Sequence, residues 1–455
     1  MTAPTIYPNA GALGLYRADD GLGVWPHKGQ VAAVGIGHSP TLRRWDGDPA
    51  KSIGAWAILA IRRAIEDAGV SPAEVDGIVF DATTTTGAWW PEGEPVPADF
   101  LAAFQNTSDP FDGLIKLSAE WLVKNMPELT GLKFVIAASI CMSMAAVSAI
   151  EAVGRGMGQT VIAVKAWHNI PGRYGHRGGH AQDTISGPMK YGSEWLAGPP
   201  VYGTAMQFQR YLHKYNKTHD MMAPFVVNSK ANGLKFPEGY WAQHRPTPLT
   251  TEEYNESRWV AEPANLYDND IPIHTACAFL FTTADRARDL RQPPAYVLGH
   301  AAGGRMAGDF LLPFKSRSTI DDLEETEEWA TRTGDRVYES SGITANDVDF
   351  ENAYDGFSLF HVFWLEGFGF FGIKRGEALD FFASQDFTIN GPTPISPSGG
   401  NIGSGRTRFW NWSDTIQQIQ GRAGERQIKK EANIGVTGSF MPVWSSFAVF
   451  GKNPD

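Results

Sequence analysis

The stretch from residue 141 to residue 153, CMSMAAVSAIEAV, limits the possible folds more than any other part of the sequence. It carries one charged residue, Glu151, and every other side chain in it is small or apolar. A helix of this composition has no polar face to turn toward water, so it has to be buried on all sides. Residues 134–137 before it and 160–164 after it are strand-like. The sequence therefore predicts a helix layer enclosed between two sheets, in an α-β-α-β-α sandwich.

A strand-helix-turn block occurs twice in the chain. Strand-like residues 31–36 lead into a helical pattern that ends at Gly69, and Ser71 with Glu74 then forms a capping box. A closely similar turn begins at Gly342, and residues 31–35 have a strand-like counterpart at 295–299. Such a turn often connects a helix to a strand in α/β proteins, but two features that recur in the same order favour an internally duplicated α/β fold.

The rest of the chain is divided around these two halves. Residues 1–28 have no periodicity and are interpreted as an N-terminal extension, followed by a first half at 29–165. Residues 166–270 break the pattern and form a long loop insertion, and 271–455 form the second half. Because long insertions often carry binding loops, Trp167 and His168 at its start are candidate substrate-binding residues.

Charge and cysteine content exclude several classes of protein. With 39 Lys and Arg against 50 Asp and Glu, the net charge of −11 argues against a nucleic-acid-binding protein. Two cysteines supply no disulfide framework and no zinc cluster, and His176 and His180 flank two glycines that disfavour a helix between them, so no metal site is expected. The sequence shows neither a leader pattern nor an apolar run of membrane-spanning length, and we expect a cytoplasmic protein.

Taken together, the motifs resemble the thiolase superfamily, in particular its branch of lipid-transfer-protein or sterol-carrier-type thiolases, which includes steroid side-chain aldolases. The resemblance spans roughly residues 30–452 and implies a duplicated five-layer sandwich. Besides the features above, it is carried by the segments 34–37, 265–268, 284–287, 352–357, 396–401 and 419–421.

The resemblance also identifies the position of the nucleophile. Related thiolases place a cysteine where the third strand enters the buried helix, since a helix N-terminus lowers the pKa of a thiol. Alignment of the small-residue pattern puts Ser139 at this position and Cys141 two residues later. A shift of two residues turns a side chain far around a helix, so we expect the thiolase nucleophile to be missing. The alternative is that a local bulge presents Cys141 to the substrate.

Two further positions differ from the pattern of the family. Where relatives carry histidine, this chain has Tyr354, followed by Asp355. A phenol titrates near pH 10 and is suited to donate a hydrogen bond or relay a proton, although a tyrosine at a strand end is also a common packing residue. Where relatives carry Gly-His-Pro, this chain has Gly405-Arg406-Thr407. Arg406 would offer a positive charge to an enolate or carboxylate, or else pair with a surface acid.

The glycine-rich turn before Arg406 is the last candidate element. It lacks the Lys-Ser/Thr pair of a phosphate loop, so its backbone N–H groups are expected to face the acyl group instead. The candidate substrate-binding residues in it are Gly399, Gly400, Asn401 and Gly405.

The resemblance implies an aldolase, a carbon–carbon lyase that performs retro-aldol cleavage of a bulky β-hydroxyacyl-CoA such as a steroid side-chain intermediate. The alternatives are an acyl-CoA thiolase or acyltransferase that uses Cys141, and a non-catalytic subunit that binds lipid or acyl-CoA. Coenzyme A thioester is then a substrate, and the chain needs no cofactor of its own. The resemblance further implies a homodimer formed through the strand after Lys133, and a complex with a small OB-fold protein whose zinc ribbon would hold the only metal.

Overall fold

The computed structural model describes residues 23–81, 113, 117–138, 141–167, 200–304, 323–442 and 444–455. Its strands are β1 (Val31–His38), β2 (Gly77–Asp81), β3 (Phe134–Ala138), β4 (Thr160–Trp167), β5 (Trp259–Ala261), β6 (Ala264–Asn265), β7 (Thr275–Thr283), β8 (Ala295–Gly304), β9 (Phe350–Asn352), β10 (Ile434–Met441) and β11 (Trp444–Gly451). Its α-helices are α1 (Ile53–Ala68), α3 (Ala119–Asn125), α4 (Met142–Gly154), α6 (Pro200–Tyr215), α7 (Ala223–Gly233), α8 (Tyr240–His244), α9 (Thr251–Asn255), α10 (Ala284–Ala287), α12 (Leu323–Ser341), α13 (Ser358–Phe368), α14 (Ala378–Ser384), α15 (Gly400–Ser404) and α16 (Trp410–Ile419).

The main sheet has the strand order β3-β2-β4-β7-β1-β8-β11-β10-β9 and consists of two halves with the same pattern. In the first half β1 and β7, and β7 and β4, are antiparallel, while β4 and β2 are parallel. In the second half β8 and β11, and β11 and β10, are antiparallel, while β10 and β9 are parallel. This repetition confirms the duplicated α/β fold.

The two turns that indicated the duplication have the same structure. Gly69 and Gly342 adopt the left-handed conformation, with φ of +74° and +65°, and each is followed by a capping box and a single 3₁₀ turn. The preceding strands also match, because Gly35 of β1 and Gly299 of β8 each lie against a helix. A Cβ atom on Gly35 would come within 2.3 Å of the Ala64 carbonyl oxygen in α1, and one on Gly299 within 2.6 Å of a backbone nitrogen in α12. Glycine at these positions lets helix and sheet pack closely.

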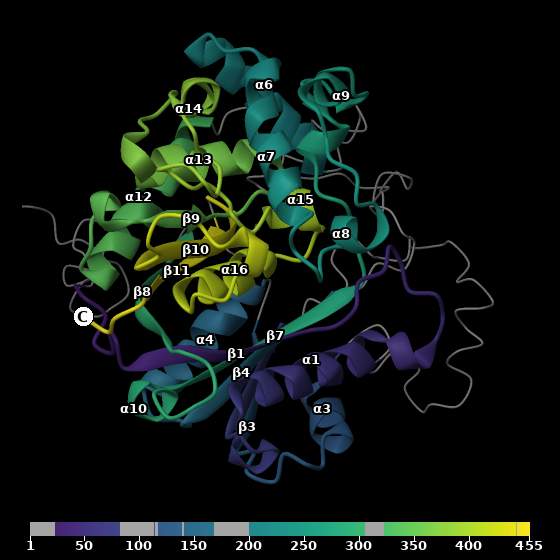
Figure 1. Cartoon of the computed structure of the whole chain (residues 1–455), viewed down its shortest axis with the longest axis vertical. Coiled ribbons are helices and arrows are strands. Elements are labelled where there is room, and N and C mark those ends of the chain that lie inside the picture. The colour runs from purple at the N-terminus through teal and green to yellow at the C-terminus, as the bar shows by residue number, and fades with distance from the viewer. Residues whose placement is uncertain are drawn as a thin grey trace, which may run out of the picture.

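Helix α4 lies in the middle layer, as the sequence predicted, and α16 lies beside it there (Figure 1). The helix begins at Met142, one residue later than expected, and none of its side chains is exposed. On one side α4 packs against β2, β4 and β7, and on the other it reaches the second half of the sheet. There Trp412 of α16 donates a hydrogen bond of 2.6 Å to Ser143, which also bonds Ser439 of β10.

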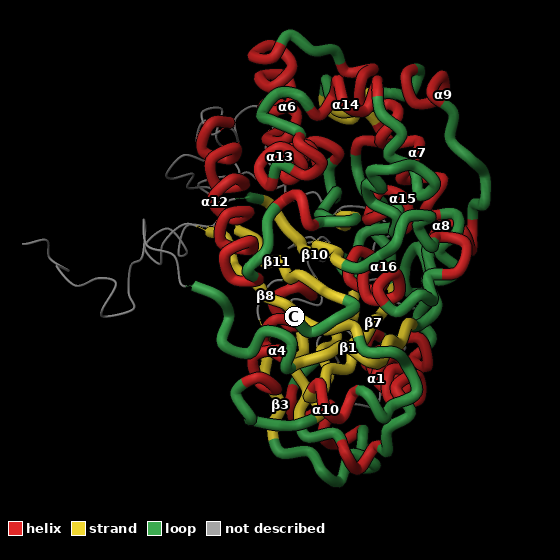
Figure 2. Tube along the Cα trace, turned by 60° about the vertical axis from the view of Figure 1, so that its left-hand side comes forward, coloured by secondary structure: helices red, strands yellow, loops and turns green. Residues whose placement is uncertain are grey.

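The outer layers consist of α1, α3 and α10 on one side and α12 and α13 on the other, so that strands run between helix layers (Figures 1 and 2). Helices α6, α7, α8 and α9 come from the segment between β4 and β7 and gather near α14 and α15 at one end of the molecule (Figure 1). Strand β7 still belongs to the first half of the sheet, and β8 is the first strand of the second half along the chain after it. The second half therefore begins after β7, later than residue 271, where the sequence division placed it. In the described residues, no helix is long and apolar enough to cross a membrane.

Candidate active site

Tyr354 lies in the turn that follows β9, at the place where the chain leaves the sheet. Its side chain is 4% exposed and packs near Phe360 and Phe440, with ring centroids 6.2 and 6.1 Å away. Its hydroxyl lies directly over Gly356, where an added Cβ atom would be 1.9 Å from Oη. Burial raises the pKa of Tyr354, against the opposing effect of Arg408. The phenol therefore keeps its proton at neutral pH. Its hydroxyl occupies the space that a side chain at position 356 would fill.

Asp355 binds the glycine-rich turn. Its fully buried carboxylate accepts hydrogen bonds from the backbone N–H groups of Asn401, at 2.7 Å, and Ile402, at 3.1 Å. A Cβ atom on Gly400 would lie 2.0 Å from this carboxylate. Burial raises the pKa of Asp355 to about 6. These two N–H groups, which we expected to face the acyl group, are thus occupied by a side chain of the protein.

Asn401 holds the turn that carries Arg406 and Arg408. Its Oδ1 atom accepts hydrogen bonds from the backbone N–H groups of Thr407, at 3.0 Å, and Arg408, at 2.9 Å. Arg408 has a φ of +69°, and its guanidinium carbon lies 4.2 Å from the ring centroid of Phe440, which has a φ of +94°. Two residues with side chains in this strained region face each other beside Tyr354, and such strain is concentrated at functional sites.

Three cationic side chains surround the ring of Trp167 at the end of β4. Lys165 Nζ lies 4.5 Å from the ring centroid, and the guanidinium carbons of Arg406 and Arg408 lie 5.2 and 5.5 Å from it. Lys165 forms a fully buried ion pair with Asp81, and burial lowers the pKa of this lysine. Arg406 and Arg408 therefore provide positive charge beside the buried ring of Trp167, where it acts strongly on an anion, whereas the charge of Lys165 is balanced by Asp81.

The segment 269–272 connects the Tyr354 turn to the Arg406 turn. The N–H group of Asp270 donates a hydrogen bond of 3.2 Å to the carbonyl oxygen of Gly356, and the N–H group of Arg406 donates one of 2.8 Å to Ile271. The side chain of Asp270 is 4% exposed. Burial raises the pKa of Asp270 to about 7, although Arg406 and Arg408 oppose this shift. Asp270 thus belongs to the same site as Tyr354.

Cys141 is buried, 2% exposed, and is the N-cap residue of α4. Cys141 precedes the first helical residue. The argument that a two-residue offset along the helix turns its side chain away from the nucleophile position therefore does not apply to it. Ser139, His168, His176 and His180 lie outside the described residues.

Gly399 and Gly405 have packing partners within the protein. Gly399, with a φ of +72°, lies where a Cβ atom would come within 2.3 Å of the backbone nitrogen of Gly233 in α7. Gly405, with a φ of +111°, lies against Ile273. These glycines bring the turn close to α7 and to the segment before β7, and their role in substrate binding stays a prediction.

The site contains residues that sequence reasoning missed. Asp270 and Arg408 were not among the candidates, and Lys165 was not singled out. Arg408 could have been predicted from the sequence, because it follows Arg406 by two residues, and in an extended segment this spacing places both side chains on one side. Asp270 could not, since it reaches the site through contacts with residues more than 80 positions away in the sequence.

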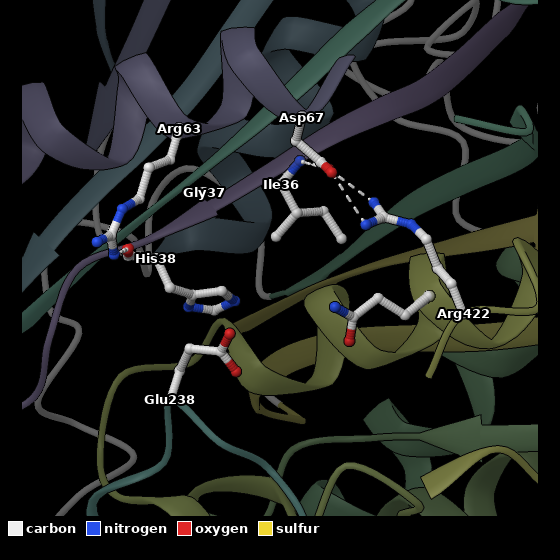
Figure 3. Close-up of a pocket in the computed structure, with 8 residues that line it drawn as sticks. Ile36, Gly37, His38, Arg63, Asp67, Glu238 and Arg422 are labelled. Carbon is white, nitrogen blue, oxygen red and sulfur yellow. Dashed lines mark hydrogen bonds and ion pairs between the residues drawn. The ribbon is translucent and has the colours of Figure 1, made fainter. Parts of the chain in front are cut away.

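A polar cavity of about 310 Å³ lies apart from these residues, between β1, α1 and α16 (Figure 3). Asp67 at its edge accepts hydrogen bonds from the Ile36 N–H group, at 2.8 Å, and from the Arg422 guanidinium, at 2.8 and 3.1 Å. The side chains of His38 and Glu238 face each other across it. None of the predicted site residues lines this cavity. Among the described ranges, no three His, Cys, Asp or Glu side chains gather as metal ligands would.

Comparison with known proteins agrees with the duplicated architecture. A family model described as thiolase C-terminal domain-like matches residues 315–450. A 17-hydroxy-3-oxo-4-pregnene-20-carboxyl-CoA lyase of Mycobacterium tuberculosis is 27% identical over 422 residues, which cover 90% of this chain and 97% of that protein. A steroid side-chain-cleaving aldolase of Thermomonospora curvata is 28% identical, over 86% of this chain and 91% of that protein. The chain belongs to the thiolase superfamily.

Solved structures place this thiolase-superfamily protein in the same fold. The Ltp2-ChsH2(DUF35) aldolase superposes with a TM-score of 0.71 at 23% identity, covering 93% of this chain and 98% of that one. The Acat5 thiolase from Ascaris suum, in complex with coenzyme A, superposes with a TM-score of 0.59 at 10% identity, over 93% of this chain and 100% of that one. The sequence relatives place the protein in the sterol-carrier-type branch of the superfamily.

Proposed function

We propose that this protein is a carbon–carbon lyase that performs retro-aldol cleavage of a bulky β-hydroxyacyl-CoA, with steroid side-chain intermediates as the class to test first. The observation that carries the proposal is the buried phenol of Tyr354, fixed over Gly356 beside Arg406 and Arg408. The names of the two curated relatives, a lyase of a steroid carboxyl-CoA and a steroid side-chain-cleaving aldolase, support the same chemistry.

The reaction needs no covalent nucleophile. The β-hydroxyl loses its proton, the bond between Cα and Cβ breaks, and a ketone or aldehyde leaves. The electron pair of the broken bond passes to the thioester as an enolate, and Cα is then protonated to give a shorter acyl-CoA. Negative charge develops on the thioester oxygen, where Arg406 and Arg408 would stabilise it. Tyr354, protonated at neutral pH, would supply the proton to Cα, and the proton taken from the β-hydroxyl would then restore the phenol.

We also propose that the protein works in a complex. The similar Ltp2-ChsH2(DUF35) aldolase carries the names of two proteins, which supports a partner for this chain. We expect that partner to be a small OB-fold protein with a zinc ribbon, and we expect two copies of this chain to pair through β3, an edge strand of the described sheet.

Thiolase or acyltransferase chemistry through Cys141 is the second candidate. It is favoured by the place of Cys141 at the N-cap of the 13-residue helix α4, because the N–H groups of a helix's first turn can hold an acyl carbonyl. Inactivation by iodoacetamide that acyl-CoA prevents would support this candidate.

A panel of β-hydroxyacyl-CoAs, incubated with the protein and its partner and analysed for carbonyl product and shortened acyl-CoA, tests the proposal. Tyr354→Phe removes one hydroxyl and should lower the rate by roughly 10²–10⁴-fold. Cys141→Ala should retain turnover and cost about 1 kcal/mol of stability. An inactive Cys141→Ala variant together with an active Tyr354→Phe variant would replace the aldolase with the thiolase. Ligand binding without turnover by the complete complex would favour a non-catalytic subunit.

A further inference from the structure

Glu351 is the middle residue of β9 and lies three positions before Tyr354, with a side chain that is fully buried. Its carboxylate accepts the backbone N–H group of Ala353, at 2.7 Å, and that of Ser396, at 3.0 Å. It also forms an ion pair of 3.0 Å with Nε2 of His361 in α13. One carboxylate therefore joins the residue before Tyr354, the segment that leads into the glycine-rich turn, and the helix that follows the Tyr354 turn.

These contacts belong to a series of hydrogen bonds that joins the two turns of the site. Asn352 accepts the N–H group of Ser398, at 3.1 Å, and Asp355 accepts that of Asn401, at 2.7 Å. Acceptors and donors follow each other in chain order, so the bonds fix the register of one turn against the other. Glu351 is the member of this series that also binds the backbone directly before the phenol.

Ser396 has a rare backbone conformation that Glu351 helps to hold. Its φ of +47° lies in the left-handed region, which residues other than glycine seldom adopt. Its N–H group donates to both the carboxylate and the carbonyl oxygen of Glu351, at 3.0 Å each. A strained residue persists where its surroundings fix it. The contact with Glu351 is therefore one of the interactions that keep the second turn in this shape.

The ion pair of Glu351 and His361 is costly to bury. Both side chains are 0% exposed, and a buried ion pair often stabilises a fold less than apolar side chains of similar volume would. Burial lowers the pKa of His361, whereas Glu351 raises it, and the net shift is upward, which favours the charged imidazole. The ring is also stacked on Phe225 of α7, with centroids 4.4 Å apart. The geometry that this pair fixes explains its presence better than the stability it adds.

We propose that Glu351, held by His361, is a positioning residue that keeps the phenol of Tyr354 in place for proton transfer, an inference that rests on the proposed function. Glu351 acts through the backbone of Ala353 rather than on the substrate. Without the carboxylate, two buried N–H groups lose their acceptor, and the two turns can shift against each other. A reacting group displaced by about 1 Å costs roughly 10²-fold in rate.

Glu351→Gln tests the inference in steady-state cleavage of a β-hydroxyacyl-CoA by the protein with its partner. The amide offers one oxygen to the two N–H groups and turns its NH₂ group toward another donor. We expect kcat to fall by roughly 10²-fold, with KM nearly unchanged. In a Tyr354→Phe background the same substitution should lower kcat hardly further, because both changes act through one hydroxyl. A glutamate with a purely structural role would slow both backgrounds equally.

Two substitutions of His361 test its part, and they decide the question if Glu351→Gln does not fold. His361→Gln keeps an N–H donor close to the position of Nε2 and should retain most of kcat. His361→Ala removes the donor and should lower kcat toward the value expected for Glu351→Gln. Circular dichroism shows whether each variant is folded. Equal kcat values in folded His361→Gln and His361→Ala would overturn the role of the histidine.

Glu366 offers a matched control on the same helix α13. It is also buried, but its carboxylate accepts the hydroxyl of Tyr211 in α6 and the N–H group of Ala378 in α14. Glu366→Gln should cost stability and keep kcat. A folded Glu351→Gln variant with wild-type kcat, or one that slows the Tyr354→Phe background as much as the wild type, would overturn the positioning role and leave the aldolase in place. Absence of cleavage by the wild-type complex on every β-hydroxyacyl-CoA would overturn both.

Discussion

Gly356 makes a sharp test of the active site because its missing side chain is the space that the Tyr354 hydroxyl occupies. In Gly356→Ala the new Cβ atom would lie 1.9 Å from Oη and 2.3 Å from the ring carbon that carries it. Ordinary contact begins near 3.4 Å, so the phenol or the turn has to move by about 1.5 Å. A reacting group displaced by about 1 Å costs roughly 10²-fold in rate, and an overpacked core costs about 1–3 kcal/mol.

The assay is steady-state cleavage of a β-hydroxyacyl-CoA by the complex, together with thermal unfolding followed by circular dichroism. We expect Gly356→Ala to fold with a lowered melting temperature and to lose about 100-fold in kcat. The double variant with Tyr354→Phe should be hardly slower than Tyr354→Phe alone, because both changes act through the same hydroxyl. Gly239→Ala is a suitable control, since its Cβ atom would lie 3.1 Å or more from its neighbours, and should change kcat little. A folded Gly356→Ala variant with wild-type kcat would refute the positioning of the phenol.

Three further predictions concern the whole protein. Burial lowers the pKa of His38 and His274 to about 4, so both side chains stay neutral in the folded chain. The unfolded chain binds protons at these histidines below pH 6.5. Each histidine therefore contributes about 3 kcal/mol to the free energy of unfolding above pH 6.5, and this contribution is lost as the pH falls toward 4. Urea unfolding at a series of pH values measures this loss, which should be smaller in His38→Gln, and an equal loss in that variant would contradict the assignment. Pairing through β3 predicts sedimentation as a dimer at micromolar concentration, and a monomer would count against it. The requirement for a partner predicts that co-expression raises yield and activity, whereas full turnover by the isolated chain would disprove it.

Local signals in the sequence predicted the fold. The composition of the middle helix, and the glycine and capping residues of the two turns, act within a few residues of one another, and the structure confirms each of them. The start of the helix was off by one residue because Cys141 caps it rather than belonging to it.

The composition of the site was less accessible from the sequence. Tyr354, Asp355 and Arg406 were found because each stands where a family motif stands. Asp270 joins them through its hydrogen bond to Gly356, 86 positions away, and through the bond of its neighbour Ile271 to Arg406, and no periodicity encodes such contacts. The N–H groups of the glycine-rich turn were expected to face the ligand, but two of them donate hydrogen bonds to the buried carboxylate of Asp355.

The burial of α4 between the two sheet halves also determines how the chain can fold. Its covering surfaces, α16 and β10, are synthesised more than 250 residues later. Until they emerge from the ribosome, an almost uncharged helix of 13 residues has one of its faces without a partner, which favours association with chaperones or with other nascent chains. The first half is therefore not an independent folding unit, and a fragment that ends before α16 should aggregate rather than behave as a stable domain.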